Sequence, residues 1–169
     1  FRLIRIDTDS VSPVEAINST VNGVRGEFVG IHIDGARILS PGVISGFARA
    51  ISAYPNAFVH TLGFHLGPKL QNLSIADGYS QTAEDNLLHS IDWRSNGYRL
   101  FDISVVAGSS KFGYLGDMTE SNCFAMPTII YKQMGGLHPG FQSPGGGICN
   151  LDIFTRAFVN PALTPVRLL

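Results

Sequence analysis

Apolar positions in the first part of the chain follow two different periods, which predict a strand and then a helix. Residues 2–6 alternate polar side chains with apolar β-forming ones, a pattern typical of a strand. Residues 12–15, Ser-Pro-Val-Glu, form a capping box with proline at the first helical position. Apolar residues follow at helical spacing, and we expect this helix to end near Gly23 or Gly26.

The next segments continue the alternation of strands and helices. Residues 27–33 are almost continuously β-forming, which predicts a strand buried on both faces. Residues 40–41, Ser-Pro, cap a helix whose apolar stripe runs over 43–51, and 57–62 is a further strand. The order strand, helix, strand, helix, strand predicts an α/β domain with a mostly parallel sheet and flanking helices.

The rest of the chain predicts further elements of the same single domain. We expect a helix over 82–93, a strand over 98–106, a short strand over 122–126, a helix from Pro127 closed by Gly135-Gly136, a loop over 137–147, a last helix over 148–158 and an extended tail from Asn160. No internal repeat or change of composition divides the sequence, so residues 1–169 are interpreted as one domain.

Composition and charge exclude several functional classes. Hydrophobic residues make up 44% and charged residues 15% of the 169, which is typical of a folded domain. The net charge of −1, without a Lys/Arg cluster, argues against nucleic-acid binding. No apolar run reaches the roughly 18 residues of a bilayer span. Cys123 and Cys149 fit two buried thiols in a reducing compartment better than a disulfide, so we expect a cytoplasmic protein.

Asp34 is the first candidate for chemistry. It directly follows the strand predicted over 27–33, and ligands of open α/β sheets bind beyond the carboxyl ends of the strands. A carboxylate there can hold a divalent cation, which in turn can bind a diphosphate. The alternative is that Asp34 only caps a turn with Gly35.

The segment from Leu137 to Arg156 is the second candidate. Residues 145–147, three glycines, lead into a helix start, where free backbone N–H groups favour anions. Asp152 lies one turn into that helix, where it can face a cleft or form an i,i+4 ion pair with Arg156. His138, in the loop near Asp152, is the histidine that we expect to have a function.

Three segments, taken in order, resemble family 2 glycosyltransferases. Residues 12–42 ("SPVEAINSTVNGVRGEFVGIHIDGARILSPG") are similar to the central block that ends in an Asp-x-Asp motif. Residues 121–141 ("SNCFAMPTIIYKQMGGLHPGF") resemble the later strand, helix and Gly-Gly-Phe-like turn. Residues 145–157 ("GGGICNLDIFTRA") are similar to the segment that usually reads Glu-Asp-x-Asp-Leu-x-x-Arg.

This resemblance implies a GT-A fold and metal-assisted sugar transfer with inversion. The donor would be a UDP- or GDP-sugar, the acceptor a glycan or another hydroxyl compound, and the cofactor Mg²⁺ or Mn²⁺ on Asp34. The residues implied in donor and acceptor binding are Asp34, Gly35, Arg37, Gly136 and Asn150. Asp152 and His138 are the implied catalytic residues near the acceptor. The family also connects the chain with polysaccharide assembly and with peripheral membrane association.

The sequence departs from the family pattern at two positions that matter for catalysis. Ala36 replaces the second acid of Asp-x-Asp. Asn150 replaces the carboxylate that usually acts as the catalytic base, and the amide of asparagine cannot act as a base. A degenerate domain that binds a sugar or a partner is therefore the alternative to an active transferase. An unrelated hydrolase has no supporting motif, since no Gly-x-Ser-x-Gly elbow or paired-His metal motif is present.

The resemblance also implies that the nucleotide-binding strands of the family precede the region where this sequence begins. We therefore expect an N-terminally truncated domain. The sheet of such a domain would expose an unpaired edge, and we expect it to form a homo-oligomer.

Overall fold

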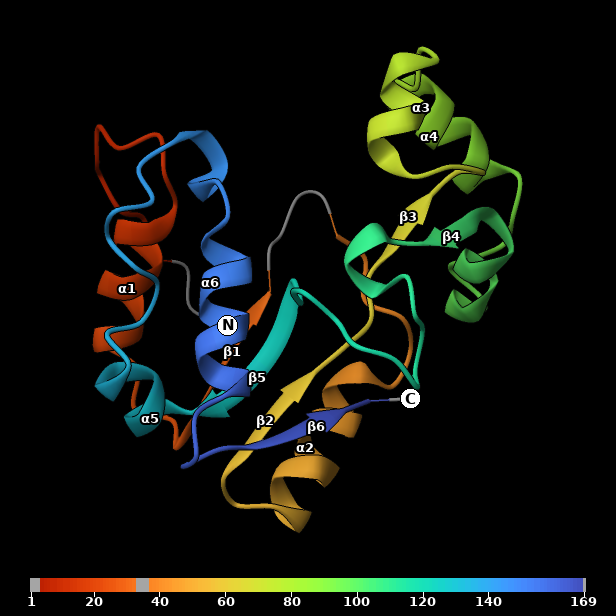
Figure 1. Ribbon diagram of the computed structural model, residues 1–169. Helices are drawn as coiled ribbons and strands as arrows, with labels where there is room; N and C mark the ends of the chain where they lie inside the picture. The colour runs from red at the N-terminus through yellow and green to blue at the C-terminus, as the bar shows by residue number, and fades with distance from the viewer. Residues whose placement is uncertain (1–3, 33–36, 169) are drawn as a thin grey trace.

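The computed structural model describes residues 4–32 and 37–168 and shows a mixed α/β fold (Figure 1). Its main sheet has four strands in the order β1-β5-β2-β6. Their bounds are Phe28–His32 for β1, Ala57–His60 for β2, Cys123–Pro127 for β5 and Thr164–Arg167 for β6.

The strand directions correct the expectation of a mostly parallel sheet. β5 lies between β1 and β2 and is antiparallel to both, whereas β2 and β6 are parallel. Thus β1, β2 and β6 run in one direction and β5 runs in the other. The sequence pattern showed β1 and β2 as consecutive strands joined by a helix, but it carried no sign that a later strand inserts between them.

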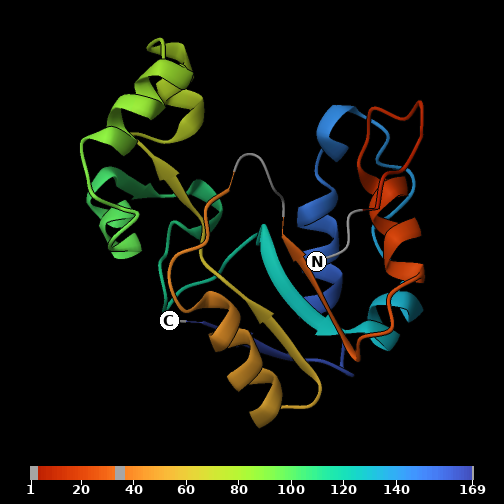
Figure 2. The ribbon, with the colours of Figure 1, turned by 180° about the vertical axis from the view of Figure 1, so that it is seen from behind.

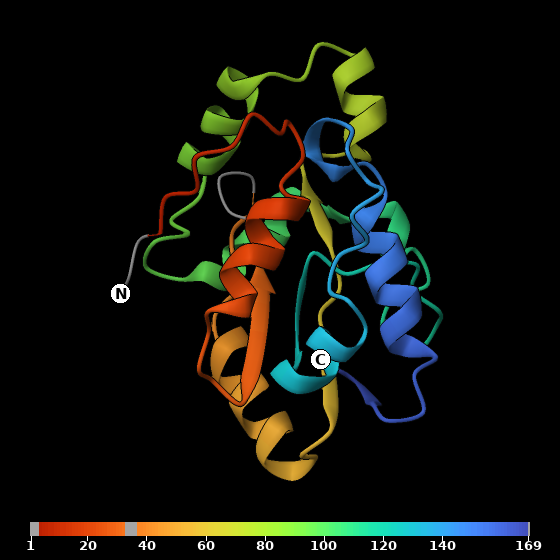
Figure 3. The same ribbon diagram turned by 90° about the vertical axis from the view of Figure 1, so that its left-hand side faces the viewer.

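Helices cover both faces of the main sheet. α1 (Val14–Asn22), α5 (Thr128–Gln133) and α6 (Cys149–Phe158) pack on one face, and α2 (Val43–Ala53) packs on the other (Figures 2 and 3). Alternate side chains of β2 and β5 enter the two cores: Phe58 and Phe124 join the α1/α5/α6 side, and Val59 and Ala125 join the α2 side. This explains why β2 and β5 are buried throughout.

The position of β1 limits its burial. It pairs with β5 alone among the described strands, so it lies at the edge of the main sheet. Val29 and Ile31 are buried, whereas Gly30 is exposed. The expectation of a strand buried on both faces is therefore wrong for β1. The predicted self-association through a sheet edge stays a prediction.

A smaller lobe projects beyond the main sheet (Figure 1). It contains a two-stranded antiparallel sheet and mostly short helices that lie between its strands in sequence. Its elements are β3 (Phe64–Leu66), α3 (Gln71–Ala76), α4 (Gln81–His89), the 3₁₀ segment η1 (Gly97–Ile103) and β4 (Ser104–Val106). Two more 3₁₀ turns, η2 (Gly108–Ser110) and η3 (Pro144–Gly146), lie in later loops.

Most predicted helices are confirmed, and several local predictions are wrong. The capping box does not form: Pro13 is the N-cap of α1, and the Ser12 hydroxyl accepts from the Val14 amide at 3.3 Å while it donates to the Phe141 carbonyl at 2.6 Å. Residues 4–6 form no strand, and the remainder of the predicted 2–6 strand lies outside the described residues. Residues 98–103 are 3₁₀, so only the end of the predicted 98–106 strand is extended. The tail from Asn160 is extended over Thr164–Arg167, as expected, where it forms β6.

In the described part of the chain, no helix is both long and apolar enough to cross a bilayer.

Candidate functional site

Four chain segments meet at one edge of the main sheet because β5 is reversed. His32, the last residue of β1, pairs with Cys123, the first residue of β5. His60, the last residue of β2, pairs with Phe124 and with Arg167 at the end of β6. The carboxyl ends of β1, β2 and β6 therefore lie beside the amino end of β5. This is the edge at which α/β sheets bind ligands.

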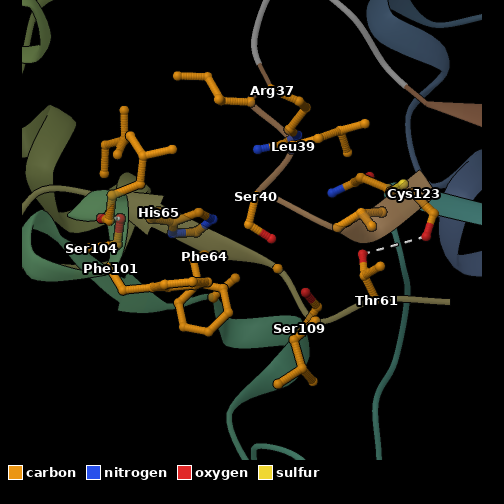
Figure 4. Close-up of a pocket in the computed structure, with 18 of the residues that line it drawn as sticks. Arg37, Leu39, Ser40, Thr61, Phe64, His65, Phe101, Ser104, Ser109 and Cys123 are labelled. Carbon is orange, nitrogen blue, oxygen red and sulfur yellow. Dashed lines mark hydrogen bonds between the residues drawn. The ribbon is translucent and has the colours of Figure 1, made fainter. Parts of the chain in front are cut away.

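A cleft of about 630 Å³ lies between this edge and the smaller lobe. Its size is that of sites for drug-sized ligands. Residues 37–43, 61–66, 100–109 and 120–123 supply most of its walls. Figure 4 shows Arg37 and Leu39 above the cavity, with His65 and Phe64 on the lobe side and Thr61 and Cys123 across from them.

Buried hydrogen bonds hold the two sheet strands together beneath the cleft. Ser121 is 2% exposed, and its hydroxyl lies 3.0 Å from the Thr61 carbonyl and 2.8 Å from the Cys123 carbonyl. Its oxygen also accepts from the Thr61 amide at 3.3 Å. The end of β2 and the beginning of β5 are thus connected through one buried side chain, which fixes the floor of the cleft.

Arg37 and His65 supply hydrogen-bond donors to the cleft. The Nε of Arg37 is buried without a hydrogen-bond partner in the described part of the chain. The Nδ1 of His65 accepts from the Gln71 amide at 2.9 Å, which leaves the ring proton on Nε2. Burial lowers the pKa of His65, and the positive charge of Arg37 lowers it further, so His65 is a neutral donor at pH 7. This pair suits an anionic ligand.

Two carboxylates line the cleft, and only one of them is engaged. The Tyr79 hydroxyl donates to Glu84 Oε2 at 3.2 Å, and burial, followed by the charge of Glu84, raises the pKa of Tyr79 to about 12. Glu120, three residues before β5, forms neither a hydrogen bond nor an ion pair through its carboxylate within residues 4–32 and 37–168. Its carboxylate is thus free to accept a proton from a ligand.

Asn150 reaches the same edge from α6. Its Nδ2 donates to Asn122 Oδ1 at 2.7 Å, and Asn122 lines the cleft. The contact places the predicted substrate-binding residue Asn150 behind the cleft wall, where its amide orients the Asn122 side chain.

Asp152 points elsewhere. Two residues along an α-helix turn the side chain by about 200°, so Asp152 and Asn150 face nearly opposite sides of α6. Asp152 Oδ2 accepts from Arg156 Nε at 2.9 Å and from Nη2 at 2.5 Å. Arg156 also donates to the carbonyls of Met134 (3.0 Å) and Gly136 (2.8 Å). The ion pair that the spacing allowed is therefore present within α6, and the bonds from Arg156 to the two carbonyls hold α6 against the end of α5.

Gly136 and His138 belong to the same turn as these carbonyls. Gly136 is buried with φ +65°, and a Cβ there would collide with Asn18 Oδ1. Asn18 donates to the Leu137 carbonyl at 2.7 Å and accepts from the Leu137 amide at 3.0 Å. His138 is exposed, and its Nδ1 accepts from the Gly140 amide. Gly136, His138 and Asp152 do not line the cleft, so the structure does not bring them together with Arg37.

The remaining histidines and the cysteines divide between the cleft and the core. His32 is half-buried at the cleft, and its Nδ1 is a buried atom without a hydrogen-bond partner in the described residues. His60 is 1% exposed, with Phe154 edge-on to its ring at 5.2 Å. Cys123 and Cys149 are buried, unpaired thiols, as expected.

The metal prediction rests on residues that the structure does not describe. Asp34 and Gly35 lie outside the described residues. Within 4–32 and 37–168, no three His, Cys, Asp or Glu side chains form a group that could hold a metal ion.

No protein-family model matches the chain, and no curated protein and no solved structure does so either.

Sequence reasoning missed Glu120, Asn122 and the role of His65. Glu120 and Asn122 precede a strand, and residues before a parallel strand lie at the edge opposite to the ligand site. Only the reversal of β5 brings them to the carboxyl ends of β1 and β2. The five residues of β5 do not reveal that the strand is antiparallel to its neighbours. No signal in the sequence could therefore have identified Glu120 and Asn122 as cleft residues.

Proposed function

We propose that this chain forms part of an inverting glycosyltransferase that uses a nucleotide-sugar donor. The observation that carries the proposal is the cleft at the strand ends, where Arg37 and His65 present donors to an anion. Two of the three blocks that resemble family 2 glycosyltransferases reach this edge: residues 12–42 contain β1 and Arg37, and residues 121–141 contain β5.

The diphosphate of a donor would bind against Arg37 and His65. Arg37 supplies a fixed positive charge, and neutral His65 supplies a hydrogen bond through Nε2. Both interactions strengthen as the bond between the sugar and the diphosphate breaks, because negative charge then accumulates on the leaving nucleoside diphosphate. Mg²⁺ or Mn²⁺, when bound to Asp34 and the diphosphate, would supply further positive charge at the same place.

The acceptor would approach through the open side of the cleft. Its hydroxyl attacks the anomeric carbon on the face opposite to the leaving group, which inverts the configuration. Phe64 and Phe101 lie edge to face with ring centroids 4.9 Å apart and line the cleft, so they offer an apolar surface to a sugar ring.

Calorimetric titration tests this proposal. UDP, GDP, UDP-glucose and GDP-mannose are titrated into the chain with and without Mn²⁺. We expect binding of at least one of them, and a loss of affinity of roughly tenfold or more in Arg37→Met. Arg49→Met, an exposed arginine on α2, is the matched control and should bind as the wild type does.

Two results would count against the proposal. No binding of any of these nucleotides contradicts a donor site in the cleft. Binding that is unchanged in Arg37→Met contradicts the placement of the diphosphate. Asp34→Ala should abolish the Mn²⁺ dependence. Binding without turnover would instead favour the alternative, a degenerate sugar-binding domain, to which Ala36 and Asn150 point.

A further inference from the structure

We propose that Glu120 is the general base that deprotonates the acceptor hydroxyl. This inference rests on the proposed function and names the carboxylate that would act as the base in that reaction. An inverting transfer needs a carboxylate near the acceptor oxygen, and the position where the family carries it holds Asn150 here.

The two alternatives near Asn150 are already engaged. The Asn150 amide donates to Asn122 and has no basic atom. Asp152 accepts two hydrogen bonds from Arg156, faces away from Asn150 across α6 and does not line the cleft. Neither side chain can take a proton from a hydroxyl bound in the cleft.

Of the two carboxylates in the cleft walls, Glu120 is the one available. Glu84 lies on the smaller lobe and accepts from Tyr79. Glu120 lies on the sheet side, two residues before Asn122, and its oxygens have no partner in the described part of the chain.

Glu120 lies on the chain segment that Asn150 contacts through Asn122. The Asn150–Asn122 hydrogen bond connects the two locations, because it joins the first turn of α6 to the segment that carries Glu120. A carboxylate on the segment before β5 would thus take over the role that the family gives to one on α6.

The proton and the electrons balance in one step. The acceptor O–H bond breaks and its proton passes to a Glu120 oxygen. The acceptor oxygen forms a bond to the anomeric carbon. The bond from that carbon to the diphosphate breaks, and its electron pair leaves with the nucleoside diphosphate.

Glu120→Gln separates this role from binding. The full chain is assayed for release of nucleoside diphosphate from the donor that binds in calorimetry, with water and octyl glucoside as acceptors. We expect donor affinity within twofold of the wild type, kcat lower by about 10²–10⁴-fold, and loss of the rising limb of the pH–rate profile. Glu27→Gln, at an exposed glutamate that does not line the cleft, is the matched control and should keep kcat within a few-fold.

Azide distinguishes a base from a structural residue. Azide ion carries no proton to remove, so it attacks the anomeric carbon without a base and yields the glycosyl azide. Glu120→Gln should form this product at close to the wild-type rate. Equal loss of the azide reaction and of transfer to octyl glucoside would show that Glu120 only maintains the cleft, and unchanged kcat would overturn the inference while leaving the proposed function intact. If the wild type releases nucleoside diphosphate from no donor, both proposals fail.

Discussion

Arg156 is predicted to stabilise the fold rather than to act in catalysis, and Arg156→Met tests this. The guanidinium donates two hydrogen bonds to Asp152 and one each to the carbonyls of Met134 and Gly136. The side chains of Arg156 and Asp152 are 31% and 24% exposed, so water can replace only part of these bonds. Methionine keeps most of the aliphatic volume and removes every donor.

The magnitude follows from the number of partners left behind. A hydrogen bond to a charged group contributes about 1.5–3 kcal/mol when buried, and contributions within one network are not additive. Partial exposure of Arg156 lowers this range. We expect a loss of about 2–4 kcal/mol in the free energy of unfolding. For a chain of this size the melting temperature should then fall by roughly 5–15 °C.

Urea denaturation followed by circular dichroism provides the measurement, with Arg99→Met as control. Arg99 also pairs with a nearby carboxylate, Asp102 at 3.1 Å, but both side chains are about half exposed. That control should lose no more than about 0.5 kcal/mol. Equal losses in the two variants would refute the reasoning. Asp152→Asn should lower stability by about 1 kcal/mol and leave kcat within a few-fold, whereas a catalytic Asp152 would lose kcat.

Two further predictions concern pH and backbone geometry. Burial lowers the pKa of His60 from 6.5 to about 4, so the unfolded chain binds a proton at a higher pH than the folded chain does. The contribution of His60 to the free energy of unfolding is therefore complete above pH 6.5. It falls by at most about 3 kcal/mol as the pH drops toward 4. Urea midpoints measured across this pH range should show that loss. In His60→Phe, the dependence of the midpoint on pH should be smaller, because only His65 and other groups then contribute to it. Gly136→Ala should cost roughly 1–3 kcal/mol more than Gly135→Ala, because both glycines have positive φ but only Gly136 faces Asn18. Equal melting temperatures for the two alanine variants would contradict this.

The helices were predictable because their signals are local. α1, α2, α5 and α6 carry apolar residues at helical spacing, and proline or glycine marks one or both of their ends. Each helix then needs only its own ten or so residues to be identified. The capping box at Ser12 failed because α1 is capped at Pro13, so the Ser12 hydroxyl accepts from the Val14 amide and donates to a distant carbonyl, that of Phe141.

The sheet and the site were not predictable in the same way. Strand direction and order depend on contacts between residues far apart in sequence, such as His32 with Cys123. Arg37 was identified only through the resemblance of residues 12–42 to family 2 glycosyltransferases. Glu120 escaped because its location depends on the reversal of β5, and the role of Asp152 depends on which face of α6 meets α5.

The strand order also has a consequence for how the chain can fold. β1 and β2 are made early, but the strand that joins them begins at Cys123, and the second partner of β2 begins only at Thr164. A chain emerging from the ribosome must therefore keep the apolar strand Ala57–His60 unpaired while more than sixty further residues are added. Such contacts between remote segments slow folding and leave the unfinished chain open to aggregation. Expression of this protein should accordingly benefit from low temperature and from chaperones that shield β2 until β5 is made.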